Sequence, residues 1–245
     1  MTRQHWERES SNWAAWARRP NFDAYWKYSP TFFELVPSAG ERTLEVGCGE
    51  GRVSRDLAAR GHHVVGVDGS PTLVRLASEA DARSSYLVAD AAALPFGADT
   101  FDLVVLYNSL MDVDDMDGCV RESSRVLRSG GSLCACITHP MADAGHFESR
   151  DSDAPFVITG SYLGQRRAFD VEETRGDLHM NFTGWTYSLE DYFRPIERSG
   201  LMIQAVREPS LVHGTGAPSP SDERWRRIPN FLMWRAIKPP KAYFL

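Results

Sequence analysis

The sequence lacks the long apolar runs, the signal segment and the basic clusters that mark membrane-bound, exported or nucleic-acid-binding proteins. No apolar run approaches the ~20 residues of a membrane-spanning helix, and the segment Met1–Arg8 has no hydrophobic signal core. Lys and Arg number 27 against 33 Asp and Glu, which gives a formal net charge of −6 without a basic block. We therefore expect a cytoplasmic protein with no membrane or nucleic-acid partner.

Cysteine is also scarce, with four residues in 245. Cys48 lies in a glycine-rich loop, Cys119 in a predicted helix, and Cys134 and Cys136 on one predicted strand, where a spacing of two places them on the same face. No second Cys/His pair completes a zinc site. We expect buried, reduced cysteines and no metal.

A glycine loop after a buried strand is the most informative feature that is present. Residues 43–46 predict a strand, and the residues after position 51 predict a helix. Between them, Gly47, Gly49 and Gly51 predict a loop through which a ligand can approach the main chain. A second strand ends in Asp68, at the ~20-residue spacing where a carboxylate meets a ribose hydroxyl in nucleotide-binding βαβ units. This spacing indicates a cofactor that contains a nucleoside.

The third glycine of the dinucleotide fingerprint is missing, because position 52 holds Arg52. Instead, Glu45 stands two residues before Gly47. An acid at this strand end would repel a pyrophosphate but can accept hydrogen bonds from an ammonium group. Arg52 either pairs with Glu45 or covers the helix surface, and we favour the second.

With this E-x-G-x-G-x-G pattern the sequence resembles the class I S-adenosylmethionine-dependent methyltransferases. The resemblance covers roughly residues 40–138 and includes the strand-like segments 101–108 and 131–138. It implies S-adenosyl-L-methionine as cofactor, Asp68 at the ribose and the Asp90 segment at the adenine. The residues expected to bind the cofactor are Tyr28, Glu45, Gly47, Cys48, Gly49, Gly51, Asp68, Gly69, Ser70, Asp90, Ala91 and Asn108.

The expected fold is α/β, with a Rossmann-like, seven-stranded, mostly parallel sheet covered by helices on both faces. One domain, 1–245, divides into a helical lid at 1–38, a cofactor-binding core at 40–138, a substrate cap at 140–185 after the fifth strand, and the rest of the core at 186–238. We expect helices near 3–18, 22–36, 51–60, 70–79, 115–127 and from Ser188, where Asp191 completes a capping box. Strands are expected near 42–46, 63–68, 85–88, 101–107 and 131–138, and a last hairpin at 201–207 and 228–237 around the loop 209–223.

Aromatic residues gather in the two segments outside the cofactor half. Nine of the 27 aromatics occur by residue 33, and the insertion after 140 adds more, with short β-like stretches at 155–158 and 178–182. Such walls suit a planar substrate, or a cationic amine through cation–π attraction; packing on the sheet is the alternative. The residues expected to bind the substrate are Trp13, Tyr25, Trp26, Asn108, Met111, His139, Tyr162, Phe182 and Trp185.

Methyl transfer from a sulfonium needs alignment in a dry pocket, and a base only where the acceptor must lose a proton. The predicted catalytic residues are His139, which follows the fifth strand, Tyr107, which ends the fourth, and Tyr25 from the lid. His139 could equally be a turn residue before Pro140, with its ring bonded to the backbone.

We expect methylation of a small molecule, aromatic or amine-containing, on O, N or C, by a monomer or homodimer. The alternatives are a nicotinamide-dependent oxidoreductase on the same fold, a cofactor-binding regulator without catalysis, and a methyltransferase acting on protein or RNA. Arg52 in place of the third glycine disfavours the oxidoreductase, and the aromatic lids disfavour a regulator without catalysis. The acidic net charge disfavours a methyltransferase acting on protein or RNA.

Overall fold

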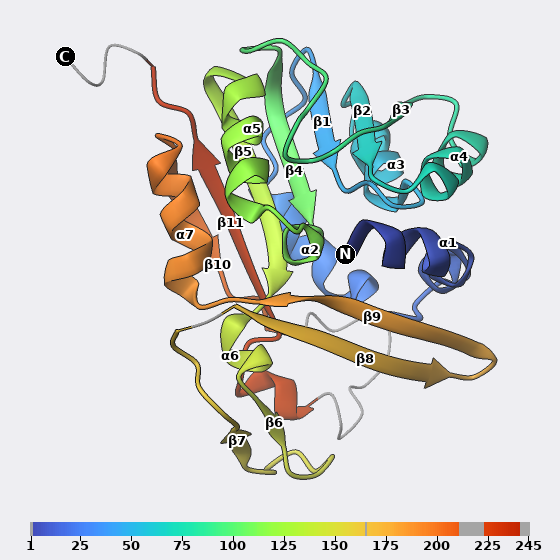
Figure 1. The fold of residues 1–245 in the computed structure, drawn as a ribbon, viewed down its shortest axis with the longest axis vertical. Helices are drawn as coiled ribbons and strands as arrows, with labels where there is room; N and C mark the ends of the chain where they lie inside the picture. The colour runs from blue at the N-terminus through green and yellow to red at the C-terminus, as the bar shows by residue number, and fades with distance from the viewer. Residues whose placement is uncertain (1, 165, 211–222, 241–245) are drawn as a thin grey trace.

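A seven-stranded sheet forms the centre of the molecule (Figure 1). The computed structural model describes residues 2–164, 166–210 and 223–240. The spatial order is β10–β11–β5–β4–β1–β2–β3, and only β11 runs antiparallel to its neighbours. These strands are β1 (Thr43–Val46), β2 (Val64–Asp68), β3 (Ser85–Val88), β4 (Phe101–Tyr107), β5 (Leu127–Thr138), β10 (Met202–Arg207) and β11 (Phe231–Ile237). The predicted Rossmann-like fold class is confirmed.

Helices cover both faces of this sheet, as alternating strand and helix segments require. In β4, Leu103 and Val105 face the cluster that includes residues of α2 (Tyr25–Leu35) and α3 (Arg52–Ala59). Val104 and Leu106 face the opposite cluster, beneath α5 (Met116–Val126) and α7 (Leu189–Arg198). The central strands are therefore buried on both sides, which explains why they read as continuous apolar runs.

Local signals place the helix starts. Ser188 and Asp191 form the predicted capping box at the start of α7. Ser70 caps α4 (Pro71–Ala80): its hydroxyl accepts a hydrogen bond from the Leu73 amide at 3.1 Å. After β3 the chain returns to the other side of β1 and forms β4 there, so the strand order reverses between β1 and β4. Open α/β sheets bind their ligands at such a point of reversal.

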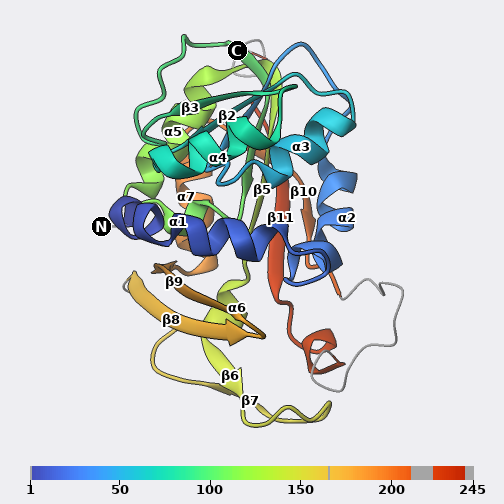
Figure 2. The same ribbon diagram turned by 90° about the vertical axis from the view of Figure 1, so that its right-hand side faces the viewer.

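The helix α1 (Thr2–Arg18) lies between the carboxyl ends of the central strands and a long hairpin of β8 (Arg167–Arg175) and β9 (Leu178–Thr186) (Figure 2). It is fixed on both sides. Glu7 accepts hydrogen bonds from the hydroxyl and amide of Thr72 at 2.7 and 3.2 Å, at the start of α4. On the hairpin side, the His5 ring bonds the Asn181 carbonyl at 2.9 Å.

The insertion after β5 differs from expectation. Its β-like stretches are confirmed as β7 (Phe156–Ile158), which pairs with β6 (Gly145–Phe147), and as the longer β9. Strand β8 was not expected, because the acids and arginines in Arg167–Arg175 obscure its alternation. The short helical segments α6 (Pro140–Asp143), η1 (Leu110–Asp112) and η2 (Arg224–Arg226) complete the described elements.

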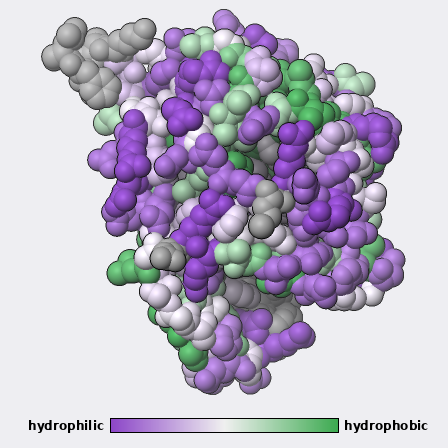
Figure 3. Space-filling view, in the orientation of Figure 1, coloured by the Kyte–Doolittle hydropathy of each residue, from purple (hydrophilic) through white to green (hydrophobic). Residues whose placement is uncertain are grey.

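The last two strands form the predicted hairpin, β10 with β11, while most of the loop 209–223 lies outside the described residues. All four cysteines are buried and free, as predicted. Within the described chain, no helix has both the length and the apolar character to cross a membrane. The face seen in Figure 3 is mainly hydrophilic, with apolar residues in small separate patches.

Candidate active site

A cavity of about 890 Å³ lies at the carboxyl ends of β1, β2 and β4, with α1 and the β8–β9 hairpin along its other walls. Cavities of about 300–1,000 Å³ with a few polar groups are typical of sites for small molecules and cofactors. The position agrees with the rule for ligands in open α/β sheets. This cavity is the candidate active site.

The glycine loop forms its floor. Gly47, Gly49 and Gly51 have φ angles of +75°, +55° and +85°, which side chains disfavour. The Gly47 amide donates to the Val67 carbonyl at 2.8 Å, so the loop is fixed to the neighbouring strand. A Cβ at Gly49 would lie 3.0 Å from Nε1 of Trp13, which shows how closely α1 approaches the loop. The predicted close approach to the main chain is thus available only to a ligand that fits under α1.

Asp68 ends β2 and holds the loop from the side. Its two oxygens accept hydrogen bonds from the Gly49 amide at 2.9 Å and the Ser70 amide at 2.8 Å. Burial raises the pKa of this carboxyl, against the lowering effect of the two amides. Each oxygen retains a second acceptor position, so Asp68 can serve both the loop and a ligand hydroxyl.

Glu45 is 1 % exposed on β1 and lines the same cavity. The Ser54 hydroxyl donates to it from α3. Burial, and then the nearby charges of Asp68 and Glu50, raise the pKa of Glu45 to about 8. A carboxylate so placed is stabilised by a cation that enters the cavity.

A third acid, Asp112 on η1, lines the cavity beside β9. Burial and the charge of Asp68 raise its pKa well above the usual range. Among the residues that the structure describes, no Lys, Arg or His forms an ion pair with Glu45, Asp68 or Asp112. These acids fit a ligand with ammonium and sulfonium groups, and they oppose a diphosphate.

The end of β4 contributes a strained residue. Asn108 has a φ of +50°, and its Oδ1 is buried without a hydrogen-bond partner in the described chain. The next residue, Ser109, bonds the Val46 carbonyl at 2.7 Å and lies against Gly47. Backbone strain of this kind clusters at ligand sites. Asn108 therefore offers an unused hydrogen-bond acceptor to a ligand. Met111, which also lines the cavity, offers an apolar surface.

Aromatic rings from α1 and β9 enclose the cavity. Phe182 packs edge-on against Trp13 and Trp16, with ring centroids 6.4 and 5.7 Å away. Trp6 also lines the cavity and packs edge-on against Trp13 at 5.8 Å. The wall therefore joins two segments more than 160 residues apart in the chain, and it limits the access of water.

Two tyrosines face the other side of the cavity. The Tyr25 hydroxyl donates to Asp56, and its ring meets the ring of Tyr107 at 5.3 Å. Burial raises the pKa of both phenols, so neither is a phenolate at neutral pH. The Tyr107 hydroxyl is a neighbour of the Cys136 thiol and has no other hydrogen-bond partner among the described groups. These groups suit hydrogen bonding to a substrate better than removal of its proton.

The structure brings most of the predicted site residues together. Of the predicted cofactor, substrate and catalytic residues, those lining the cavity are Trp13, Tyr25, Glu45, Gly47, Cys48, Gly49, Asp68, Gly69, Ser70, Asp90, Ala91, Tyr107, Asn108, Met111 and Phe182. Those outside the lining are Tyr28, Trp26, Gly51, His139, Tyr162 and Trp185. Their predicted contacts have no support from this geometry and stay predictions.

His139 is occupied by the fold. It is 2 % exposed, its Nδ1 accepts from the Met141 amide at 3.0 Å, and its Nε2 bonds Glu208 at 2.9 Å. Burial lowers the pKa of this imidazole. Both ring nitrogens are engaged away from the cavity, which matches the turn alternative more closely than the base.

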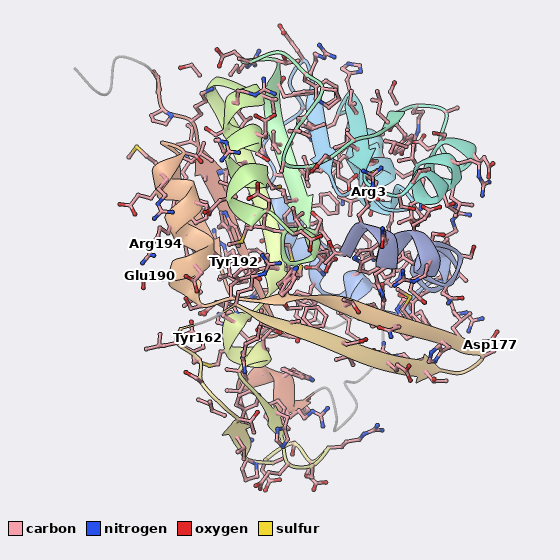
Figure 4. All side chains as sticks on the ribbon, in the orientation of Figure 1. Arg3, Tyr162, Asp177, Glu190, Tyr192 and Arg194 are labelled. Atoms are coloured by element: carbon pink, nitrogen blue, oxygen red, sulfur yellow. The ribbon has the colours of Figure 1, made fainter. Side chains whose placement is uncertain are left out.

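Three other predicted residues are held by neighbours. Tyr28 packs on Phe231 with centroids 4.7 Å apart, and Trp185 donates from Nε1 to Asp114 at 3.1 Å. Tyr162 accepts a hydrogen bond from the Leu189 amide at 3.0 Å, and Figure 4 shows it beside α7, away from α1.

The sequence reasoning missed several lining residues, chiefly Arg3, Trp6, Trp16, Arg52, Asp112, Phe169, Arg175 and Phe231. Both alternatives for Arg52 were wrong, because it pairs with Asp23 at 2.8 Å. Arg3, labelled in Figure 4, bonds the Gly69 carbonyl at 2.8 Å. Their place on the cavity wall depends on how α1 and the hairpin dock, which local sequence patterns do not show.

Comparison with known proteins supports this geometry. A family model described as a methyltransferase domain matches residues 44–135. A demethylmenaquinone methyltransferase from Roseiflexus sp. (strain RS-1) is 32 % identical over 182 residues, 67 % of this chain and 75 % of the relative. The chain belongs to the class I S-adenosylmethionine-dependent methyltransferases. The motif region, glycine loop to β5, is the part of this family member that the model matches.

A second relative and a solved structure extend the comparison of this class I family member. A demethylmenaquinone methyltransferase from Clavibacter sepedonicus is 36 % identical over 117 residues, 46 % of this chain and 47 % of the relative. The chain thus spans about half the length of the first curated relatives it matches. An S-adenosylmethionine-dependent methyltransferase structure from Mesorhizobium loti aligns with a TM-score of 0.70 at 23 % identity, over 88 % of this chain and 98 % of that one. At this identity, the similarity shows that the two proteins share a fold.

Proposed function

We propose that this chain transfers a methyl group from S-adenosyl-L-methionine to a small-molecule acceptor, aromatic or amine-containing. The observation that carries the proposal is the group of buried acids, Glu45, Asp68 and Asp112, around the glycine loop without a protein cation paired to them in the described chain. A cofactor with two positive centres and no phosphate favours the ionised form of these acids. Family membership supports the same cofactor.

Each residue then has a proposed task. Glu45 accepts hydrogen bonds from the ammonium group, Asp68 from the ribose hydroxyls, and the loop amides shape the floor. When bound, S-adenosyl-L-methionine supplies the methyl group as a reactive sulfonium. Asn108 and Met111, at the end of β4, lie on the side toward β5 and orient the acceptor.

On the acceptor side of the cavity, the walls are proposed to enclose the methyl acceptor. Trp13 and Phe182 exclude water and offer π-faces to a planar or cationic acceptor. Tyr25 and Tyr107 stay neutral and can donate or accept hydrogen bonds. The relatives' printed names include a demethylmenaquinone methyltransferase and a malonyl-[acyl-carrier protein] O-methyltransferase, so their acceptors differ in kind.

The decisive experiment has two arms. Calorimetry with S-adenosylhomocysteine and with NADH should show binding of the first alone. Mass spectrometry of a metabolite extract, incubated with the protein and methyl-labelled cofactor, should then show one compound gaining the label. Binding of NADH but not S-adenosylhomocysteine would overturn the proposal in favour of an oxidoreductase. Label in protein or RNA only would overturn the small-molecule acceptor.

A further inference from the structure

Arg52 occupies an unusual position in the site. It is the first residue of α3, directly after the glycine loop, and its side chain, 14 % exposed, lines the cavity. One guanidinium nitrogen, Nη1, donates to Asp23 at 2.8 Å and to the Ala17 carbonyl at 3.2 Å. The guanidinium also stacks on the Tyr25 ring, 4.0 Å from its centroid. Arg52 is therefore a fixed, nearly buried cation on the cavity wall.

Part of this guanidinium is available to a ligand. The hydrogen bonds within the described chain use Nη1, and none uses Nε or Nη2. The two other arginines on the wall are engaged elsewhere: Arg3 bonds the Gly69 carbonyl by the end of β2, and Arg175 binds Glu173 and the Phe22 carbonyl on the hairpin side. Arg52 lies 5.6 Å from the Trp13 ring, whose Nε1 is against Gly49. Of the three arginines that line the cavity in the described chain, Arg52 is the one that directly follows the glycine loop.

We infer that Arg52 binds the α-carboxylate of the cofactor's methionine portion, opposite Glu45, which takes the ammonium. The inference rests on the proposed function. An amino-acid group carries both charges on one carbon, so a site for it needs an anion and a cation close together. Glu45, on the strand before the glycine loop, and Arg52, at the start of the helix after it, both line the cavity. A guanidinium fork matches a carboxylate in geometry and charge.

The contacts of Arg52 also connect the ligand to the lid. Ala17 belongs to α1, Asp23 to the connection after it, and Tyr25 begins α2. Arg52 thus contacts the segment 17–25 through Nη1 and its ring stacking, and it would bind the carboxylate through Nε and Nη2. Asp23 binds Nη1 and so fixes the plane of the guanidinium, with Nε and Nη2 left as donors for a ligand.

The test uses ligands that differ by one group. Decarboxylated S-adenosylmethionine keeps the adenosyl, sulfonium and ammonium groups and lacks only the carboxylate. We expect the wild-type protein to bind S-adenosylmethionine about tenfold or more tightly than the decarboxylated form, because a hydrogen bond to a charged group is lost. Arg52→Gln should remove this preference: it weakens S-adenosylmethionine binding about tenfold and leaves the decarboxylated form unchanged.

Arg55→Gln is the matched control, since Arg55 is on the same helix, binds Glu50 at 2.8 Å and does not line the cavity. It should keep the preference. Equal losses for both ligands in Arg52→Gln, or no loss for either, would overturn the inference and leave a structural role. If Arg52→Gln does not fold, Arg52→Lys, which keeps the charge without the fork, should show the same selective loss at smaller size. Failure of the wild-type protein to bind either ligand would instead refute the proposed function.

Discussion

At the scale of single residues, the site is a concentration of buried carboxyl groups. Glu45 and Asp68 occupy the positions that the motif predicts, and both have a pKa raised mainly by burial. In a protein interior such groups are costly unless something compensates them. The raised pKa values are therefore measurable signs of a ligand site, and they give predictions that do not depend on knowing the acceptor.

Asp68→Ala should raise the Kd for S-adenosylhomocysteine about tenfold or more, as measured by calorimetry. The carboxylate holds the Gly49 and Ser70 amides, and losing a charged acceptor costs about 1.5–3 kcal/mol. Asp102→Ala is a suitable control, because Asp102 accepts from the Arg42 amide at 2.7 Å outside the cavity. An unchanged Kd in Asp68→Ala would remove Asp68 from the ribose role.

Binding of S-adenosylhomocysteine at pH 7 should release a proton from Glu45. With a pKa of about 8, this carboxyl is mainly protonated in the free protein at that pH. An ammonium group beside it favours the charged form and lowers the pKa. Calorimetry in buffers of different ionisation enthalpy measures the release. Glu45→Gln should abolish it, and persistence of the release in that variant would assign it to another acid.

The free protein should also lose stability as pH rises because of Glu45. The folded pKa, about 8, exceeds the unfolded value of 4.5, so the folded state binds more protons between these values. The free energy of unfolding therefore falls with rising pH in this window, by up to about 1.4 kcal/mol per pH unit. Urea denaturation from pH 5 to 8 should show a flatter profile for Glu45→Gln. Parallel profiles would mean that Glu45 is not protonated in the folded state.

At the scale of elements, the predictable parts are those with local signals. The glycine loop, the capping box at Ser188 and the apolar strand β4 follow from short-range sequence patterns, and all lie where expected. Strand β8 could not be predicted, because its charged residues break the alternation and, among the described strands, it pairs with β9 alone. The exclusion of Trp26 and Tyr162 from the cavity lining could not be predicted either, since it depends on how whole elements dock.

Arg52 shows the same limit most clearly. Its sequence position is fixed by the motif, but its partner Asp23 lies 29 residues earlier, in a connection whose path depends on α1. The cation–π contacts with Trp13 and Tyr25 arise only once α1 and α2 are docked. Tertiary contacts of this kind cannot be predicted from the local spacing of residues in the sequence.

Phe182→Ala should loosen the hairpin from α1. Phe182 makes edge-on contacts with Trp13 and Trp16, and such aromatic pairs contribute about 0.5–1.5 kcal/mol each. Amide exchange in α1 and β9 should therefore become about tenfold faster by hydrogen–deuterium exchange mass spectrometry. Phe193→Ala, which removes a ring packed on Trp234 at 5.2 Å, should leave α1 unchanged. Unaltered exchange in α1 after Phe182→Ala would show that polar contacts alone hold it.

At the scale of the whole molecule, the site lies between the sheet and the hairpin, so ligand binding should stabilise the entire fold. S-adenosylhomocysteine at 100 times its Kd should add about 2.7 kcal/mol, which raises Tm by about 5–11 °C for a chain of this size. NADH at the same concentration should not change Tm. Differential scanning fluorimetry measures both, and the reverse pattern would exclude the assigned cofactor.

The docking of α1 on β9 has a consequence for the order in which the molecule is built. Residues 2–18 are synthesised well before the Asn181 and Phe182 groups that hold them on the hairpin side, which follow more than 160 residues later. Contacts of such sequence separation form late, because closing a long loop costs entropy before any contact compensates it. The nascent chain can therefore pair strands β1 to β5 before β9 is available to hold α1 from the hairpin side, and cofactor present at that stage would meet an open crevice.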